Sequence, residues 1–446
     1  MLKIALESLG CSKNLVDAEI MLGLLNRKGH QLVGDYINAD IVIVNTCGFI
    51  ESAKQESVDS IVQYADLKNE GKFKYLLVSG CLAQRYSEEL LKEIPEIDGI
   101  IGTGSYEKIT DVVDSLMDRD EIIELGDINF TFNEELPRYI STPPYLAYLK
   151  IGEGCDNNCT YCIIPKLRGK YRSRKLESLV EEAKRLSDRG VKELVVIAQD
   201  TTVYGVDLYG KQMLPELLEE LSKMDFEWIR VMYSYPESIT EEIVDVIAKH
   251  SNICNYFDMP IQHANDRVLK LMNRKTTRKE LKSKIDMIRN KIPDATIRTT
   301  FIVGFPGETD EEFESLLDFV RDIKFDRLGA FAYSREEDTP ADKLPNHLDE
   351  SVKKNRLDRI MMVQQNISES LNQEKIGKEY KVLIEDKIDD TLYIGRTECD
   401  ADEIDSIVYL ETTNNIKIGD FIDVIIENAY EYDLRAIPKD LLNQYN

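Results

Sequence analysis

The sequence predicts an α/β protein in three parts: an N-terminal doubly wound sheet with three cysteines, a central partial barrel of six parallel strands, and a small C-terminal β-barrel. Short β-branched runs alternate with helical segments over most of the chain, which is typical of parallel sheets. A double proline at 143–144 separates two such regions, and the last region changes to short strands divided by turns. The predicted parts are 1–118, a connection over 119–142, then 143–372 and 373–446.

Each of three strands predicted in the first part ends at a cysteine beside a glycine. The strands are Lys3–Leu9, Asp40–Asn45 and Tyr75–Ser79, and the pairs are Gly10-Cys11, Cys47-Gly48 and Gly80-Cys81. A single cysteine after a strand is more often a small core residue. Three of them would meet, however, at the carboxyl edge of a parallel sheet, where ligands bind, and glycine leaves room for a bulky group. The sequence therefore predicts an iron–sulfur cluster on Cys11, Cys47 and Cys81.

The central part has six predicted strands separated by helical stretches such as Ser178–Arg189 and Asp310–Ile323. The strands are Ala147–Ile151, Glu193–Ala198, Ile229–Tyr233, Tyr256–Met259, Thr296–Val303 and Arg327–Ala332. This alternation predicts a partial (β/α)6 barrel whose chemistry lies on the loops at the carboxyl ends of its strands.

The first of those loops holds Cys155, Cys159 and Cys162 at C-x3-C-x2-C spacing. Clustered thiolates are ligands for iron–sulfur clusters and zinc. A structural zinc site requires four ligands, and no fourth cysteine or histidine follows closely. Three cysteines on a four-iron cluster would leave one iron open to a small molecule. The alternative is that these thiols are simply buried, as free cysteines often are.

This loop resembles the cluster loop of the radical S-adenosylmethionine (SAM) enzymes, in which an aromatic residue commonly precedes the third cysteine, as Tyr161 does. The resemblance implies that the open iron chelates the amino and carboxyl groups of SAM. Polar residues at the ends of the later strands are candidates for holding SAM beside Tyr161. They are Gln199, Ser234, Gln262 and Glu308.

The composition favours a cytoplasmic protein. Of 446 residues, 43% are apolar, no apolar run is long enough for a membrane span, and the chain enters a strand pattern at once, so we expect neither a membrane nor a signal peptide. The eight cysteines are expected to be reduced. A net charge of -26 favours a basic macromolecular partner; the alternative is that this charge only keeps the protein soluble. One basic run, 166–175, is either a solvated loop, a nucleic-acid contact or a source of charge that neutralises carboxylates at the site.

Residues 350–376 are expected to form a long polar helix, followed by strands at Tyr380–Glu385, Thr391–Thr397, Ser406–Leu410 and Phe421–Glu427. This spacing predicts a small β-barrel. From Ile376 onward there are seven basic and seventeen acidic residues, a net charge of -10. Such a barrel would favour a cationic partner over an oligonucleotide.

Along nearly the whole chain, the sequence resembles the methylthiotransferases, which combine a three-cysteine domain, a radical SAM barrel and a terminal TRAM barrel. The motifs that carry the resemblance are Ser8–Asp17, Asn45–Ile50, Asp258–His263 and Phe331–Glu336. They look most like the branch that modifies ribosomal protein S12. The resemblance implies transfer of a methylthio group to the β-carbon of an S12 aspartate. One [4Fe-4S] cluster, on Cys155, Cys159 and Cys162, would generate a 5'-deoxyadenosyl radical from SAM, and a second would hold the sulfur.

Two alternatives come from other classes. The first is a tRNA methylthiotransferase, which the basic run favours and the acidic barrel opposes, so tRNA is not the expected partner. The second is a non-catalytic protein with structural iron–sulfur or zinc sites. The electron donor cannot be identified from the sequence, and Cys254 and Cys399 are expected to be ordinary thiols.

Overall fold

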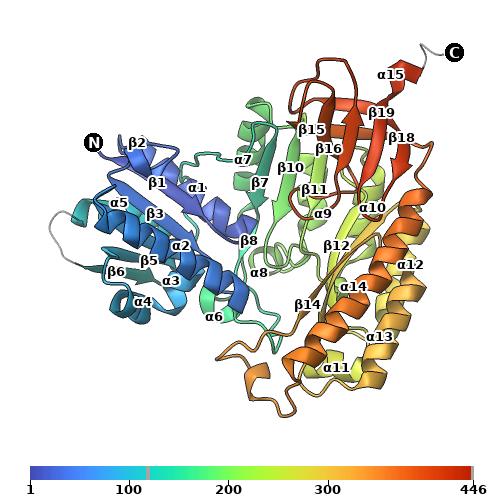
Figure 1. The fold of residues 1–446 in the computed structure, drawn as a ribbon, viewed down its shortest axis with the longest axis horizontal. Coiled ribbons are helices and arrows are strands. Elements are labelled where there is room, and N and C mark those ends of the chain that lie inside the picture. The colour runs from blue at the N-terminus through green and yellow to red at the C-terminus, as the bar shows by residue number, and fades with distance from the viewer. Residues whose placement is uncertain (117–120, 443–446) are drawn as a thin grey trace.

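The structure, a computed structural model, describes residues 1–116 and 121–442 and has three packed parts in chain order (Figure 1). The N-terminal part is a six-stranded parallel sheet. Its strands are β1 (Lys3–Ser8), β2 (Gln31–Leu32), β3 (Ile41–Thr46), β4 (Tyr75–Gly80), β5 (Gly99–Gly104) and β6 (Ile122–Gly126). They are ordered β2-β1-β3-β4-β5-β6, so the chain reverses direction across the sheet between β1 and β3.

Helices cover both faces of this sheet, which confirms the predicted doubly wound fold. One face packs on α1 (Ser12–Arg27) and α5 (Ile109–Ser115), and the other packs on α2 (Glu51–Asn69), α3 (Cys81–Arg85) and α4 (Ser87–Glu93). The alternation within β3 explains why: Ile41 and Ile43 join the first core, and Val42 and Val44 join the second. A strand with both faces buried must be apolar throughout. Short 3₁₀ turns η1 (Tyr36–Asn38) and η2 (Tyr106–Lys108) complete this part.

The segment expected to be an irregular connection contains a strand. β6, within 119–142, pairs with β5 and forms the edge of the N-terminal sheet. Only Ile122 of this strand is buried, since an edge strand has one open side, and its apolar pattern is correspondingly weak. Sheet pairing therefore continues to Gly126, and the domain boundaries drawn from the sequence stay a prediction.

The central part contains all six predicted parallel strands. They are β7 (Leu146–Lys150), β10 (Glu193–Ile197), β11 (Trp228–Val231), β12 (Tyr256–Gln262), β13 (Thr296–Val303) and β14 (Arg327–Ala332). They form two three-stranded sheets, joined where Ile229 bridges to Ile253. The amphipathic helices outside are α7 (Leu176–Asp188), α9 (Leu214–Leu221), α10 (Glu241–Lys249), α12 (Arg278–Lys291) and α13 (Asp310–Ile323). The predicted long helix is α14 (Glu350–Gln373), which packs along β14 and α13.

Shorter elements line the carboxyl edge of this partial barrel and connect its strands. They are β8 (Gly152–Glu153), α6 (Ile164–Arg168), β9 (Arg172–Ser173), α8 (Val206–Tyr209), η3 (Pro236–Ser238), α11 (Asp266–Leu271) and η4 (Ala341–Lys343). Within 1–116 and 121–442, none of the helices combines the length and the apolar character that crossing a membrane requires.

The C-terminal part is a closed five-stranded barrel in the order β15-β16-β17-β19-β18. Its strands are β15 (Glu379–Lys387), β16 (Leu392–Thr397), β17 (Val408–Glu411), β18 (Phe421–Ala429) and β19 (Leu434–Pro438), followed by α15 (Lys439–Leu442). Four of these were expected, and β19, which closes the barrel between β17 and β18, was not.

The barrel packs against the amino-terminal ends of the central strands (Figure 1). Arg396 of β16 pairs with Glu193, the first residue of β10. The Phe421 ring meets the ring of Trp228, the first residue of β11, with centroids 4.7 Å apart. Both contacts lie at the opposite end of the parallel strands from the cysteine loop that follows β7.

Candidate active site

Cys11, Cys47 and Cys81 lie together at the carboxyl edge of the N-terminal sheet. Cys11 caps α1 after β1, Cys47 follows β3, and Cys81 begins α3 after β4. They therefore flank and adjoin the point where strand order reverses, the usual ligand site of such sheets. The glycines set the spacing: a Cβ on Gly10 would lie 2.7 Å from the Cys47 Cβ, and a Cβ on Gly48 would lie 2.9 Å from the Cys81 backbone.

The surroundings of this N-terminal triad shift the pKa values of its thiols in different directions. Burial, with the neighbouring thiols, raises the pKa of Cys47 to about 12. Burial also acts to raise the pKa of Cys11, but the nearby charges of Lys13 and Arg168 outweigh it, and that pKa is lowered. Thiolates are the form that binds metal, and the two cations favour that form at this edge.

The second triad sits on the loop after β7. Gly154 adopts a φ of +77°, and a Cβ there would lie 2.1 Å from the Lys170 carbonyl oxygen, so only glycine fits. The Cys155 amide donates to the Gly169 carbonyl at 3.1 Å, and Thr160 donates from its amide to the Met272 carbonyl at 3.1 Å. Hydrogen bonds to two other segments of the chain therefore hold the cysteine loop in place.

Cys155 and Cys159 of this loop are buried, and Cys162 is partly buried. Burial raises the pKa of Cys155 to about 11 and raises that of Cys162 as well, with the neighbouring thiols adding to both effects. The Cys159 sulfur lies 3.3 Å from the Tyr235 hydroxyl. In the described part of the chain, no three cysteine, histidine or carboxylate side chains have gathered at metal-binding distances. The thiols of each triad lie close enough to raise one another's pKa, as Cys47 and Cys162 show, but they are not arranged as a ligand set.

Four of the predicted SAM contacts line the same rim. The Tyr161 side chain packs against the cluster containing Phe305 and Tyr333, and burial raises its pKa. Ser234 is buried, and its amide donates to the Asp258 carbonyl at 2.9 Å. Gln262 ends β12 with a φ of +73°.

Gln199 has a side-chain oxygen on this rim that is free to accept a hydrogen bond from a ligand. Its amide nitrogen donates to Glu153 at 2.6 Å, while its buried Oε1 has no hydrogen-bond partner among the described residues. A buried acceptor without a donor is costly. A ligand with an ammonium group, such as SAM, fits this position, and the all-sulfur triad beside it fits an iron–sulfur cluster.

Glu308 lies on the loop after β13 as predicted, and its carboxylate already has hydrogen-bond partners there. It accepts hydrogen bonds from the Gly304 amide at 2.9 Å and from Arg356 at 2.8 Å. Burial raises the pKa of Glu308 to about 7. These hydrogen bonds hold the loop in its conformation, and a contact of Glu308 with SAM stays a prediction.

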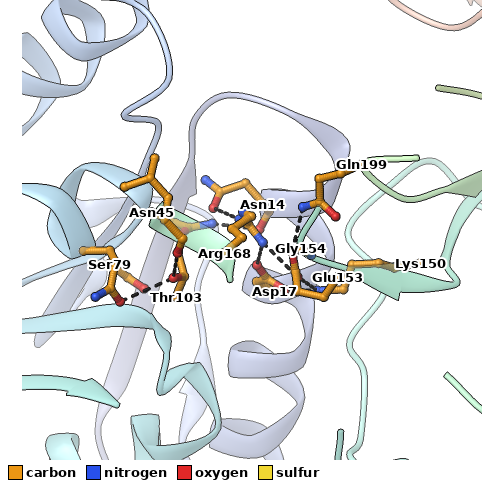
Figure 2. A network of polar contacts seen from close by, with 12 residues as sticks. Asn14, Asp17, Asn45, Ser79, Thr103, Lys150, Glu153, Gly154, Arg168 and Gln199 are labelled. Carbon is orange, nitrogen blue, oxygen red and sulfur yellow. Dashed lines mark hydrogen bonds and ion pairs between the residues drawn. The ribbon is translucent and has the colours of Figure 1, made fainter. Parts of the chain in front are cut away.

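A buried network of four charges lies between α1 and the loop after β7 (Figure 2). Arg168 donates to Asp17 and to Glu153, each at 2.9 Å. Lys150 pairs with the same two carboxylates, and its contact with Glu153 measures 2.9 Å. Two cations thus balance two anions, and all four side chains are at most 5% exposed.

The network connects directly to both triads. Glu153 immediately precedes Gly154 and accepts its amide at 3.2 Å, at the start of the second cysteine loop. Asp17 belongs to α1, which Cys11 caps, and Arg168 also donates to Asn14 of that helix at 3.3 Å. The sequence analysis did not identify Asp17, Lys150 or Glu153 as site residues, because nothing in the local pattern marks a carboxylate whose partner lies elsewhere in the chain.

Only part of the basic run neutralises carboxylates, since the Lys166 side chain is 59% exposed, and the role of the whole run stays a prediction. Arg168 belongs to the buried network, and Arg174 pairs with Glu134 at 3.1 Å and Glu182 at 2.7 Å. These guanidinium groups neutralise carboxylates within the chain. Cys254 is buried in the core between barrel and strands, and Cys399 is partly buried; neither lies in a triad.

The N-terminal domain also contacts the segment that follows β14, the last strand of the partial barrel. Glu336, after β14, accepts from Arg85 of α3 at 3.0 Å and pairs with Lys54 of α2 at 3.0 Å. Burial acts to raise the pKa of Glu336, but hydrogen bonds from Ser334 and these cations outweigh it, and the pKa is lowered. The N-terminal domain therefore covers the carboxyl edge of the central strands from two sides.

Family profiles match the three parts separately. Residues 3–102 match the "Uncharacterized protein family UPF0004", residues 149–320 the "Radical SAM superfamily", and residues 376–438 the "TRAM domain". Among solved structures, the methyltransferase TsrM from Kitasatospora setae, with tryptophan and a SAM analogue bound, aligns with a TM-score of 0.56 at 14% identity, covering 74% of this chain and 73% of that one. That likeness concerns the fold alone.

Curated relatives match over almost the full length. A protein of Clostridioides difficile named "Ribosomal protein uS12 methylthiotransferase RimO" is 68% identical over 97% of this chain and 98% of its own length. A protein of the same name from Lachnoclostridium phytofermentans is 49% identical over 97% of this chain and 99% of its own. With this identity and the cysteine triads, the chain belongs to the RimO family of radical SAM methylthiotransferases.

Proposed function

We propose that this protein adds a methylthio group to the β-carbon of an aspartate in ribosomal protein S12. The observation that carries the proposal is the placement of two cysteine triads at the carboxyl edges of two parallel sheets, joined by the Arg168 network. Installing a group on an unactivated carbon requires chemistry that no side-chain acid or base provides, so the cofactors must supply it.

The second triad, Cys155, Cys159 and Cys162, holds a [4Fe-4S] cluster in this proposal. With SAM bound, that cluster supplies the one-electron chemistry that removes hydrogen from an unactivated carbon. The chain's own part is to place SAM: Gln199 offers a free buried oxygen, while Ser234, Gln262 and Tyr161 line the rim. The Tyr235 hydroxyl lies within hydrogen-bond distance of the Cys159 sulfur and helps to hold its position.

The N-terminal triad, Cys11, Cys47 and Cys81, holds a second [4Fe-4S] cluster that carries the sulfur to be transferred. Three ligands leave one iron free for that sulfur. The close approach of Gly10 to Cys47 supports this assignment, since a larger residue would push the two segments apart.

In this proposal, the negative charge of the C-terminal barrel selects S12 as the substrate. S12 is a basic protein, and the C-terminal barrel region carries a net charge of -10. The barrel sits at the amino-terminal ends of strands whose carboxyl ends bear the site, and strands of five to eight residues span about 15–25 Å. An S12 molecule that contacts both must bridge that length, so the barrel acts as a remote anchor.

Iron counting tests the two-cluster proposal. Wild-type protein reconstituted with iron and sulfide should carry about eight irons per chain, by the count of two four-iron clusters. Triple alanine variants of either triad should each carry about four and keep the far-ultraviolet circular dichroism of the wild type. Four irons in the wild type, all lost with the Cys155 triad, would contradict the second cluster.

A salt-dependent pull-down tests the partner. S12 should be retained at low ionic strength and released as salt rises, because the attraction between exposed charges is screened. A tRNA retained more strongly than S12 would favour the alternative substrate. In that case, the assignment of the acidic barrel is wrong.

A further inference from the structure

Lys13 is a buried cation at the meeting point of the two domains. It lies in the first turn of α1, two residues after Cys11, and is only 7% exposed. Its ammonium nitrogen lies 3.1 Å from the centre of the Tyr233 ring. Tyr233 follows β11 of the central part with a φ of +59°, so the residue that receives Lys13 stands on the rim of the other site.

The other cations of this region are paired, and Lys13 is not. Lys150 and Arg168 both bind Asp17 and Glu153. Within the described residues, no carboxylate lies within ion-pair distance of the Lys13 ammonium, and no acceptor oxygen is hydrogen-bonded to it. Buried charges are normally paired, and an aromatic face compensates an ammonium only in part. No carboxylate of the described residues therefore balances the Lys13 charge, which otherwise acts on the Cys11 thiol and lowers its pKa.

We propose that Lys13 binds the side-chain carboxylate of the target aspartate. This inference rests on the proposed function and deepens it. An ammonium has three N–H donors, so with its nitrogen over the face of the Tyr233 ring it can still donate to an incoming anion. A carboxylate oxygen held about 2.8 Å from Nζ puts the aspartate β-carbon about 4 Å from the same nitrogen. Lys13 thus sets the reacting carbon between the two triads and selects aspartate over its uncharged analogue.

The test is a binding cycle that uses cluster-loaded enzyme without SAM, so that no turnover occurs. Fluorescently labelled S12, with either aspartate or asparagine at the modified position, is titrated with wild type, Lys13→Gln and Lys13→Arg. Lys92→Gln, an exposed lysine of the same domain, is the matched control. A charged hydrogen bond of this kind corresponds to about a ten- to hundredfold change in Kd.

The wild type should bind the asparagine form of S12 ten- to hundredfold more weakly than the aspartate form. Lys13→Gln should bind both forms equally and weakly, Lys13→Arg should restore much of the preference for aspartate, and Lys92→Gln should behave as wild type. Iron content is measured for every variant, because Lys13 neighbours a cluster ligand.

Three results would overturn the inference. The first is equal affinity of the wild-type enzyme for both forms of S12, a comparison that needs no variant of the enzyme. The second is an unchanged aspartate preference in Lys13→Gln. The third is a Lys13→Gln variant that loses SAM affinity or shifts a cluster potential while keeping the preference, which would assign the charge to the cofactors. If the wild type neither binds nor modifies S12, the proposed function fails instead.

Discussion

Removing Arg168 should loosen the contact between the N-terminal and central domains. The four-charge network is neutral as it stands, and Arg168→Met leaves Asp17 and Glu153 with Lys150 alone, a net buried charge of -1. Arg168 is 2% exposed and contributes two ion pairs of 2.9 Å. Breaking a buried pair by deleting one partner costs about 3–5 kcal/mol. The equilibrium for opening this contact should then rise by about two to three and a half orders of magnitude.

Amide hydrogen exchange followed by mass spectrometry measures this opening segment by segment, which suits a chain of several domains. Peptides around Leu167, whose carbonyl accepts from Thr103, should exchange faster in Arg168→Met. Adding Asp17→Asn restores neutrality and should recover most of the protection. Arg185→Met, which removes a guanidinium that is 53% exposed, should leave this exchange unchanged.

The reasoning is refuted if Arg168→Met exchanges like wild type, or if the double variant exchanges as fast as the single one. A gradual effect of pH is also expected in Arg168→Met. The leftover carboxylate can take up a proton at low pH, so the destabilisation should grow as pH rises.

Three further changes have defined outcomes. Gly154→Ala places a Cβ 2.1 Å from the Lys170 carbonyl oxygen and should remove about half of the bound iron; full iron content would contradict the loop geometry. Burial raises the pKa of Glu385 to about 7, above an unfolded value of about 4.3, so folded stability is lost as pH rises between these values. Glu385→Gln should therefore raise Tm at pH 8 more than at pH 5. An equal change in Tm at both pH values would contradict the raised pKa of Glu385. Arg85→Met removes a hydrogen bond of 3.0 Å to Glu336 and should speed exchange after β14, unless that contact contributes nothing to domain closure.

The parts of the fold that the sequence predicts are those with a strong local pattern. Ile41–Val44 is apolar throughout because both of its faces are buried, and β10 of the central part shows a similar run. The strands that were not predicted, β2, β5, β6, β8, β9 and β19, have weak local signals. β2, β8 and β9 have two residues each, β5 has three glycines in six residues, β6 has one buried side chain, and β19 ends at a proline. Their strand character comes from pairing with distant partners, which no local window contains.

The candidate site divides in the same way. Both triads follow from cysteine spacing and from adjacent glycines, which are local signals. The charge network does not, because Lys150 and Arg168 reach Asp17 across 133 and 151 positions. The local pattern likewise does not show that Glu308, which was predicted to contact SAM, accepts a hydrogen bond from the backbone of its own loop; the SAM contact itself stays a prediction.

Mass spectrometry of S12 tests the central claim most directly. S12 is isolated from cells that lack this gene and from the same cells carrying the wild type, Cys11→Ala or Cys155→Ala. We predict a methylthio mass on one S12 aspartate with the wild type only, because both triads are required. S12 unmodified in all four strains, or modified equally by a cysteine variant, would contradict the account.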